Sequence, residues 1–509
     1  MSAAHQSTAG SIVAQEKAKL QKALRRVDLV LFAACAIIAI DTLAFTASAG
    51  GQAITWLVLS FFLFLIPYGL LVSELGTTFP AEGGPYEWAR MAFGRLPGSI
   101  TAILYWISNP IWIGGTLTGT AIAALNTFLL GSDMSEGWEI VFGLGFTWAV
   151  VGTAIIALRF GKWVPNVGLF LKAGLIVFFA GLAIAYLIDR GHTGTVGAGD
   201  LKPTISGFLL VIGVIMFNWL GFELANGASE EMDDPQRDVP NMIVGSGLVS
   251  AGLYAMLLIM MMLVIPESGL TNVAGFTDAY QQVAVELGGA ATAIGDVVAI
   301  VIVLTLWVSG STWLMGADRV QAIAALDGAA PAWMGRFSGK LGTPIAMNIM
   351  SGIMSSLFVI FVFHFSSGTL ANFFAVMIAL VISTTAMAYF FIFPALPVLR
   401  KKYPDVHRPY RVPGGMLGCY ICAALTEFFT VVTAISLLWP GLIDQIFGQS
   451  YSIYDSWGVS RLFFETVTLG TFAVIIVFGL IFWYIGRIER ARGVSGEEEV
   501  VFGAAASGD

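Results

Sequence analysis

Two acidic residues, Asp41 and Glu223, lie within otherwise apolar stretches of the sequence. A carboxylate at the centre of a membrane-spanning helix costs about 3 kcal/mol, so it is expected to face a cavity or a partner. The chemistry open to such a group is the binding of a positive charge, which is either an amine or a proton. Both residues are therefore candidate binding groups.

The residues around each carboxylate predict a break in its helix. Small and polar residues follow Asp41 through residues 42–51, and Gly221, a poor helix former, precedes Glu223. Irregular backbone at membrane depth is tolerated only beside protein or a water-filled cavity, and broken helices hold small charged solutes there. Two alternatives stay open: Asp41 could hydrogen-bond a neighbouring helix, and Glu223 could lie near the membrane surface in a straight helix. The predicted substrate-binding residues are Asp41, Thr42, Leu43, Asn218, Trp219, Gly221 and Glu223.

The elements that position these groups follow from the composition. The 509-residue chain is 57% hydrophobic and 11% charged, whereas about 25% of residues are charged in a typical soluble protein. Its apolar residues form runs of roughly 20, the length that a helix needs to cross a bilayer. The alternation of a β-barrel is absent, so the predicted fold class is an all-α polytopic membrane protein. Twelve spans are predicted, at residues 29–49, 53–73, 98–126, 138–157, 164–187, 207–227, 243–265, 291–316, 344–364, 371–396, 416–439 and 463–485.

Lys and Arg residues gather in the N-terminal segment and in alternate loops between these spans. Because cytoplasmic loops are enriched in these residues, we predict that both termini are cytoplasmic in a cell membrane, the plasma membrane of a bacterium. The predicted domains are a cytoplasmic segment at residues 1–26, a transmembrane domain at 27–487 and a disordered cytoplasmic tail at 488–509.

The composition also excludes several classes of function. The net charge of -8 offers no general basic surface, and no nucleic-acid-binding pattern is found, so no nucleic acid partner is expected. Two of the three cysteines form a CxxC without a second ligand pair, and no HExxH or GxSxG pattern occurs. We therefore expect no metal, no cofactor and no enzymatic activity. The missing GxxxxGK[ST] phosphate loop disfavours a nucleotide-driven pump.

Four local motifs stand out along the chain. They are residues 73–86, which begin Ser-Glu-Leu-Gly and end Gly-Gly-Pro-Tyr; residues 221–240, which begin Gly-Phe-Glu; residues 313–319, Trp-Leu-Met-Gly-Ala-Asp-Arg; and residues 408–415, Arg-Pro-Tyr-Arg-Val-Pro-Gly-Gly. Together they resemble the motifs of the amino acid/polyamine/organocation superfamily of permeases. Within that superfamily, residues 265–275 and 313–319 are most similar to the bacterial glutamate:GABA antiporter branch.

The resemblance implies a fold and a function. The fold is ten helices in two inverted five-helix repeats, as in the leucine transporter, with helices 1 and 6 broken and two further C-terminal helices. The function is secondary active transport of amino acids or related amines by alternating access, through antiport or proton coupling. The implied partners are the amino acid or amine, protons or a counter-substrate, and the lipid bilayer. Uptake of a polyamine or another cationic amine is the main alternative, and a transporter-like sensor is a more distant one.

This sequence departs from the superfamily pattern in its first span. Most amino acid permeases of the superfamily carry a Gly-Ser-Gly-like stretch there, whose amides bind the substrate carboxylate, whereas this chain has Asp41-Thr-Leu43. An acid at this place favours an amine or a proton. Lys172 of the fifth span lies where proton-coupled permeases of the superfamily often carry a lysine, so it is the candidate for proton coupling. A fixed structural ion pair is the other interpretation of Lys172.

Overall fold

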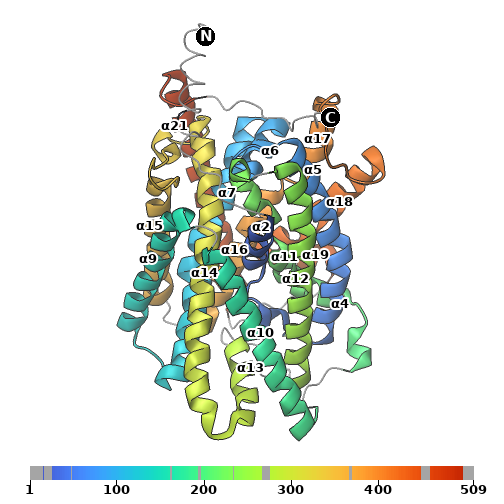
Figure 1. Ribbon diagram of the computed structural model, residues 1–509, viewed down its shortest axis with the longest axis vertical. Helices are drawn as coiled ribbons and strands as arrows, with labels where there is room; N and C mark the ends of the chain where they lie inside the picture. Colours follow the sequence, from blue (N-terminus) through green and yellow to red (C-terminus); the bar gives the residue numbers. More distant parts are fainter. Residues whose placement is uncertain are drawn as a thin grey trace.

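The computed structural model describes residues 15, 26–47, 49–160, 163–192, 197–232, 234–265, 275–365, 370–448 and 459–496. Its helices run roughly along the long axis of the molecule, with α6 and α17 at one end, hereafter the α6 end, and α13 at the other (Figure 1). The helices are α2 (Arg26–Ile37), α3 (Leu43–Ala47), α4 (Gly51–Ser60), η1 (Phe61–Leu65), α5 (Ile66–Thr78), α6 (Gly84–Phe93), α7 (Arg95–Trp112), η2 (Ile113–Leu117), α8 (Thr118–Ala124), η3 (Leu125–Leu130), α9 (Glu136–Phe160), α10 (Trp163–Arg190), η4 (Ala198–Leu201), α11 (Ile205–Trp219), η5 (Phe222–Glu231), α12 (Pro235–Val264), α13 (Gly275–Val283), η7 (Ala284–Ala290), α14 (Ala291–Leu326), η8 (Ala332–Gly335), α15 (Ile345–Phe365), α16 (Leu370–Tyr389), α17 (Ala395–Lys402), α18 (Gly415–Leu438), α19 (Pro440–Phe447) and α21 (Arg461–Ala491).

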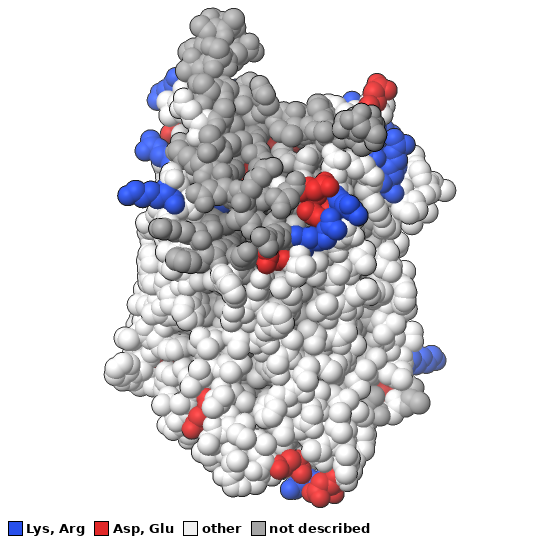
Figure 2. Space-filling model, viewed as in Figure 1, with Lys and Arg blue, Asp and Glu red and all other residues white. Residues whose placement is uncertain are grey.

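The chain is a multi-pass membrane protein. Among the described residues, 10 helices are long and apolar enough to cross a membrane. The remaining two predicted spans are the first, which is divided into α2 and α3, and α16, in which the fully described residues Val376–Tyr389 form a shorter apolar helix. Figure 2 shows an almost uncharged belt between the two ends of the molecule, with most of the visible Lys and Arg at the α6 end. The predicted all-helical fold is therefore confirmed.

Several pairs of helices five spans apart pack against each other. The second span (α4, η1 and α5) contacts the seventh (α12), the third (α7) contacts the eighth (α14), and the fourth (α9) contacts the ninth (α15). The two broken spans also meet, since α2 contacts η5 and α3 contacts α11. Two five-helix repeats that pack around a common axis give this pairing.

Both predicted breaks occur where the two spans face each other. In the first span, α2 ends at Ile37 and α3 begins at Leu43. In the sixth, α11 ends at Trp219 and Gly221 adopts a φ of 134°, which L side chains rarely adopt. A Cβ atom at Gly221 would lie 3.2 Å from Cγ1 of Ile37. Glycine therefore allows both the conformation of the second break and its close approach to the first.

Ion pairs hold the connecting segments together at the α6 end. Asp327, which follows α14, accepts a hydrogen bond of 2.8 Å from Arg95 Nε and one of 2.6 Å from the Tyr86 hydroxyl. Arg90 of α6 pairs with Glu87 at 2.5 Å and lies 3.8 Å from Asp327. Burial opposes the charge of Arg90, yet these two carboxylates raise its pKa above the usual value. The guanidinium groups therefore stay charged and tie α6 to the end of α14.

Candidate functional site

The break in the first span is stabilised by side chains from three other spans. A helix end leaves four backbone carbonyls without intrahelical partners, and inside a membrane each of these needs a donor. The Lys172 amine donates to the carbonyls of Cys35 and Ile38, at 2.5 Å each. The Trp313 indole donates to the Ala36 carbonyl at 2.9 Å and the Tyr254 hydroxyl to the Ile37 carbonyl at 2.6 Å, so all four are bonded.

Asp41 lies in the non-helical segment between α2 and α3 and is 4% exposed. Its Oδ2 atom accepts a hydrogen bond of 2.8 Å from the Trp112 indole of α7, and the Thr116 hydroxyl is close by. Its Oδ1 atom is buried and has no hydrogen-bond partner in the described part of the chain. The opposite charges of Asp41 and Lys172 attract each other across the break. Asp41 is therefore a buried carboxylate with one oxygen available.

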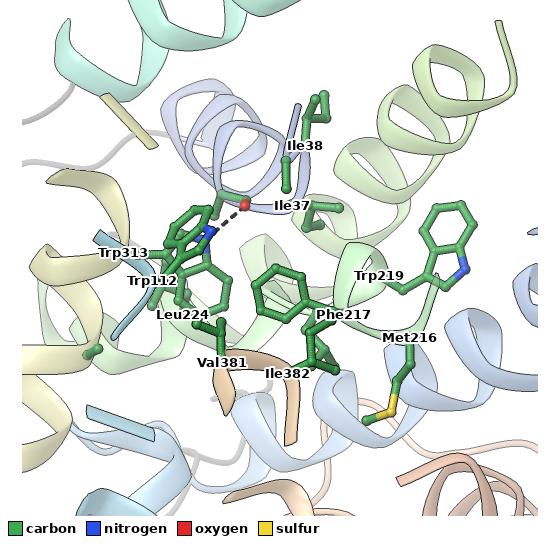
Figure 3. Close-up of a cluster of buried hydrophobic side chains, with 14 of the residues drawn as sticks. Ile37, Ile38, Trp112, Met216, Phe217, Trp219, Leu224, Trp313, Val381 and Ile382 are labelled. Atoms are coloured by element: carbon green, nitrogen blue, oxygen red, sulfur yellow. Dashed lines mark hydrogen bonds between the residues drawn. The ribbon is translucent and has the colours of Figure 1, made fainter. Parts of the chain in front are cut away.

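Aromatic rings form a wall next to this carboxylate. The ring of Trp112 packs edge-on against those of Phe217 and Trp313, with centroids 6.1 and 6.3 Å apart. All three line a small cavity together with Asn109 and Thr385. The cavity is about 10 Å³, enough for roughly one water molecule. Figure 3 shows Trp112, Phe217 and Trp313 grouped on one side, with the indole of Trp219 turned away from them.

The remaining predicted residues of the two breaks bond to each other or to neighbouring helices. The Thr42 hydroxyl donates to Asn218 Oδ1 at 2.5 Å, and Asn218 Nδ2 donates to the Thr46 hydroxyl at 3.3 Å. These bonds join α3 to α11. Trp219 donates to the Ser60 hydroxyl at 2.9 Å, away from the cavity. The side chain of Leu43 lies outside the described residues.

Glu223 is fully buried among three tyrosines from three different spans. The Tyr105 hydroxyl of α7 donates to Oε1 at 2.7 Å, and the hydroxyls of Tyr68 and Tyr389 donate short hydrogen bonds to the same carboxylate. The Tyr68 oxygen also accepts hydrogen bonds from the backbone amides of Gly221 and Phe222, at 3.1 and 2.9 Å. Tyr68 thus connects the second break to the carboxylate that follows it.

The two acids therefore have separate surroundings in this conformation. Trp112, which binds Asp41, and Tyr105, which binds Glu223, are two turns apart on α7, a rise of about 10 Å. The three tyrosines, Trp313 and Phe217 are not among the site residues predicted from the sequence. A tyrosine near the middle of an apolar span was the one feature that could have indicated such a residue, but a single sequence does not show which neighbour the ring faces.

Within the described residues there is no group of three or more His, Cys, Asp or Glu that could hold a metal ion.

Comparisons with known proteins agree with this architecture. A family model described as amino acid permease matches residues 24–454. The chain is 26% identical over 456 residues to a probable agmatine/putrescine antiporter of Lactococcus lactis, AguD, covering 89% of this chain and 93% of that protein. It is 24% identical over 449 residues to the branched-chain amino acid permease BcaP of Bacillus subtilis, covering 83% and 92%. A solved structure of a manganese transporter from Eremococcus coleocola matches with a TM-score of 0.57 and 14% identity over 92% of this chain and 94% of that one. That likeness concerns the fold alone, which is of the leucine-transporter type.

Proposed function

The chain belongs to the amino acid permease family, and from this membership and the geometry of the first break we propose that Asp41 binds the ammonium group of the transported solute. Members of such a family move amino acids or related amines across a membrane by alternating access. The proposal concerns which chemical group of the solute is recognised, and by which residues.

The observation that carries the proposal is that Asp41 Oδ1, close to Trp112 and the two rings that pack against it, has no hydrogen-bond partner within the described part of the chain. Lys172 attracts the carboxylate, but its Oδ1 atom has no hydrogen-bond donor among the described residues, so this oxygen favours a ligand that brings a hydrogen-bond donor and a positive charge. Trp112, Phe217 and Trp313 add ring faces that attract a cation by about 0.5–2 kcal/mol. An ammonium group meets both requirements, and every amino acid or alkylamine carries one.

A diamine or another dication is a specific candidate within this class of amines. The specific observation is that each of the two breaks carries a buried acid, Asp41 or Glu223, and that the α7 residues that bind them, Trp112 and Tyr105, are two turns apart. In a conformation that frees Glu223 from its tyrosines, a cation at each end of one solute would meet one carboxylate. The name of the antiporter from Lactococcus lactis, with which this chain aligns over most of its length, points to the same class of solute. We therefore propose cationic amines first and neutral amino acids second.

Lys172 is proposed to act on the first break, where its charge replaces that of a metal cation. Its amine binds two carbonyls at the end of α2 and attracts Asp41. Loss or gain of a proton on this amine would change how firmly α2 is held, which is a route by which a proton gradient could drive transport. We further propose that the α6 end, which is rich in Lys and Arg, faces the cytoplasm of the cell.

Transport by purified protein in liposomes tests the proposed function. Labelled agmatine, putrescine, GABA, glutamate and a branched-chain amino acid are supplied with and without a pH gradient, and with and without unlabelled solute inside. We expect the amines without a carboxylate to be taken up fastest. Uptake of glutamate in preference to every amine would contradict binding through Asp41, and no flux of any solute under any condition would contradict transport itself.

We propose that Glu223 closes the transport pathway through the protein and does not bind the solute in this conformation, because three tyrosine hydroxyls donate hydrogen bonds to its carboxylate. A glutamine there can accept fewer of these hydrogen bonds. We expect Glu223→Gln to slow transport at least tenfold while the dissociation constant of a monoamine changes less than threefold. Glu427→Gln on α18, another Glu→Gln change inside a span, is the matched control. A large loss of affinity with normal maximal flux would instead place Glu223 in direct contact with the solute.

A further inference from the structure

An apolar groove lies on the outside of the bundle, apart from the site. It has a volume of about 260 Å³ and runs between α5 and α12. Gly69 and Gly247 line it, and a Cβ atom on Gly247 would lie 3.2 Å from the ring of Phe222, another lining residue. Val244 and Leu248, also on its wall, are each 62% exposed. Since this surface belongs to two spans, the groove opens toward the hydrocarbon of the bilayer.

The groove has the depth of one leaflet. Its lining residues extend along the continuous helix η1–α5 from Phe61 to Ser73. That segment rises about 18 Å, whereas the whole hydrocarbon core is about 30 Å thick. Ser73 and Pro240, both lining residues, lie toward the α6 end, so the groove begins there and ends near the middle of the membrane. Its dimensions and composition suit one acyl chain.

A basic cavity lies at the mouth of this groove. It measures about 330 Å³ and is lined by Arg400, Arg408 and Arg411. Tyr410 lines the groove and Arg411 lines the cavity, so one short segment of chain borders both. This segment is held in place because the Val412 amide, next in sequence, donates to Glu74 Oε2 at 2.7 Å.

The cavity carries more positive than negative charge. Glu74 is the acid there: Arg400 donates two hydrogen bonds to it, at 2.7 and 2.5 Å, and Arg408 Nε lies 3.4 Å away. Arg411 makes no ion pair within the described residues and is exposed. Burial and the nearby charges of Arg400 and Arg411 lower the pKa of Arg408 despite Glu74. Glu74 and backbone carbonyls bind Arg400 and Arg408. Arg411 is therefore the guanidinium group that would attract a further anion.

From the groove and the cavity together we infer a binding site for one anionic phospholipid, with an acyl chain between α5 and α12 and the phosphate at Arg411. Basic pockets beside spans bind anionic headgroups in this way. A soluble anion would fill only the cavity, and a neutral lipid would fill only the groove. The acyl chain would lie against Phe222, which directly precedes Glu223, so the lipid would contact the broken sixth span from outside.

Native mass spectrometry of the detergent-purified protein tests this site with phosphatidylglycerol and phosphatidylcholine of identical acyl chains. We expect the first bound adduct of phosphatidylglycerol at roughly fivefold lower concentration, since one basic residue at a membrane surface contributes about that factor. Arg411→Gln should remove the difference and Arg411→Lys should restore it. Val244→Trp should fill the groove and weaken phosphatidylglycerol binding severalfold.

Two matched variants and one competitor complete the experiment. Lys401→Gln removes a charge near the cavity without altering its lining, and Val249→Trp enlarges a 40% exposed residue of α12 outside the groove; both should bind phosphatidylglycerol normally. Glycerol phosphate should displace the lipid only at far higher concentration. Three results would each overturn the inference. The unmodified protein could bind the two lipids equally, Arg411→Gln could keep the preference for phosphatidylglycerol, or glycerol phosphate could compete as well as the lipid at the same concentration.

Discussion

Asp41→Asn is expected to weaken the binding of an amine solute by roughly tenfold to a hundredfold, the value of a hydrogen bond to a charged group. The amide has the size of the carboxylate and still accepts the hydrogen bond that Trp112 donates at 2.8 Å. It lacks the negative charge that an ammonium group would neutralise. The effect should therefore fall on affinity, with little loss of folded protein.

Equilibrium binding of labelled agmatine or putrescine to the purified variant measures this effect. Asp189→Asn is the matched control, because that carboxylate lies at the end of α10 and its side chain is 67% exposed. Thermal unfolding of both variants shows whether the fold is kept. If Asp41→Asn binds every tested amine as tightly as the unmodified protein does, Asp41 has a structural role in joining the first span to α7.

Lys172→Met should reduce transport at least tenfold and make the remaining flux independent of an imposed pH gradient. Methionine has a similar length but donates no hydrogen bond, so the carbonyls of Cys35 and Ile38 would both lose their donor. An unsatisfied buried group costs about 1–3 kcal/mol, and the charge of Asp41 would lose its attraction to the amine. We therefore expect a lower temperature of unfolding as well.

Uptake into liposomes at several internal and external pH values separates the two roles of Lys172. Lys202→Met, at an exposed position outside the spans, should leave flux and its pH dependence unchanged. A variant Lys172→Met that is less stable yet keeps the pH dependence per folded molecule would leave the amine as a fixed structural partner. Full stability together with unchanged uptake would contradict both roles.

The number and position of the spans could be predicted because a bilayer acts on each helix separately. Every span needs about 20 apolar residues whatever its neighbours are, so hydropathy alone located the twelve ranges. The breaks were also predictable, since Gly221 and the polar residues after Asp41 are local features of the chain. Which partners stabilise the breaks was not, because Lys172, Tyr254 and Trp313 come from three other spans.

For the two acids of the candidate site, too, the local sequence predicts some properties and only the packing of the helices decides the others. That Asp41 and Glu223 lie in breaks at membrane depth follows from the residues around them. The structure adds that one oxygen of Asp41 has no hydrogen-bond partner among the residues that the structure describes, whereas Glu223 is enclosed by tyrosines from α5, α7 and α16. In the sequence these tyrosines are single residues of three separate apolar spans. No local pattern in the sequence therefore predicts that they bind the same carboxylate.

The sequence by itself determined the class of protein, the spans, the two breaks and the presence of buried charges, because each depends on residues that are neighbours along the chain. Only the tertiary structure decided which of these charges are paired. Pairing depends on helix packing, which brings residues more than 100 positions apart within hydrogen-bond distance, as with Lys172 and the carbonyls of Cys35 and Ile38. In the sequence, Asp41 and Glu223 are both acids beside a helix break within an apolar span. Their hydrogen-bond partners differ because different helices pack around them.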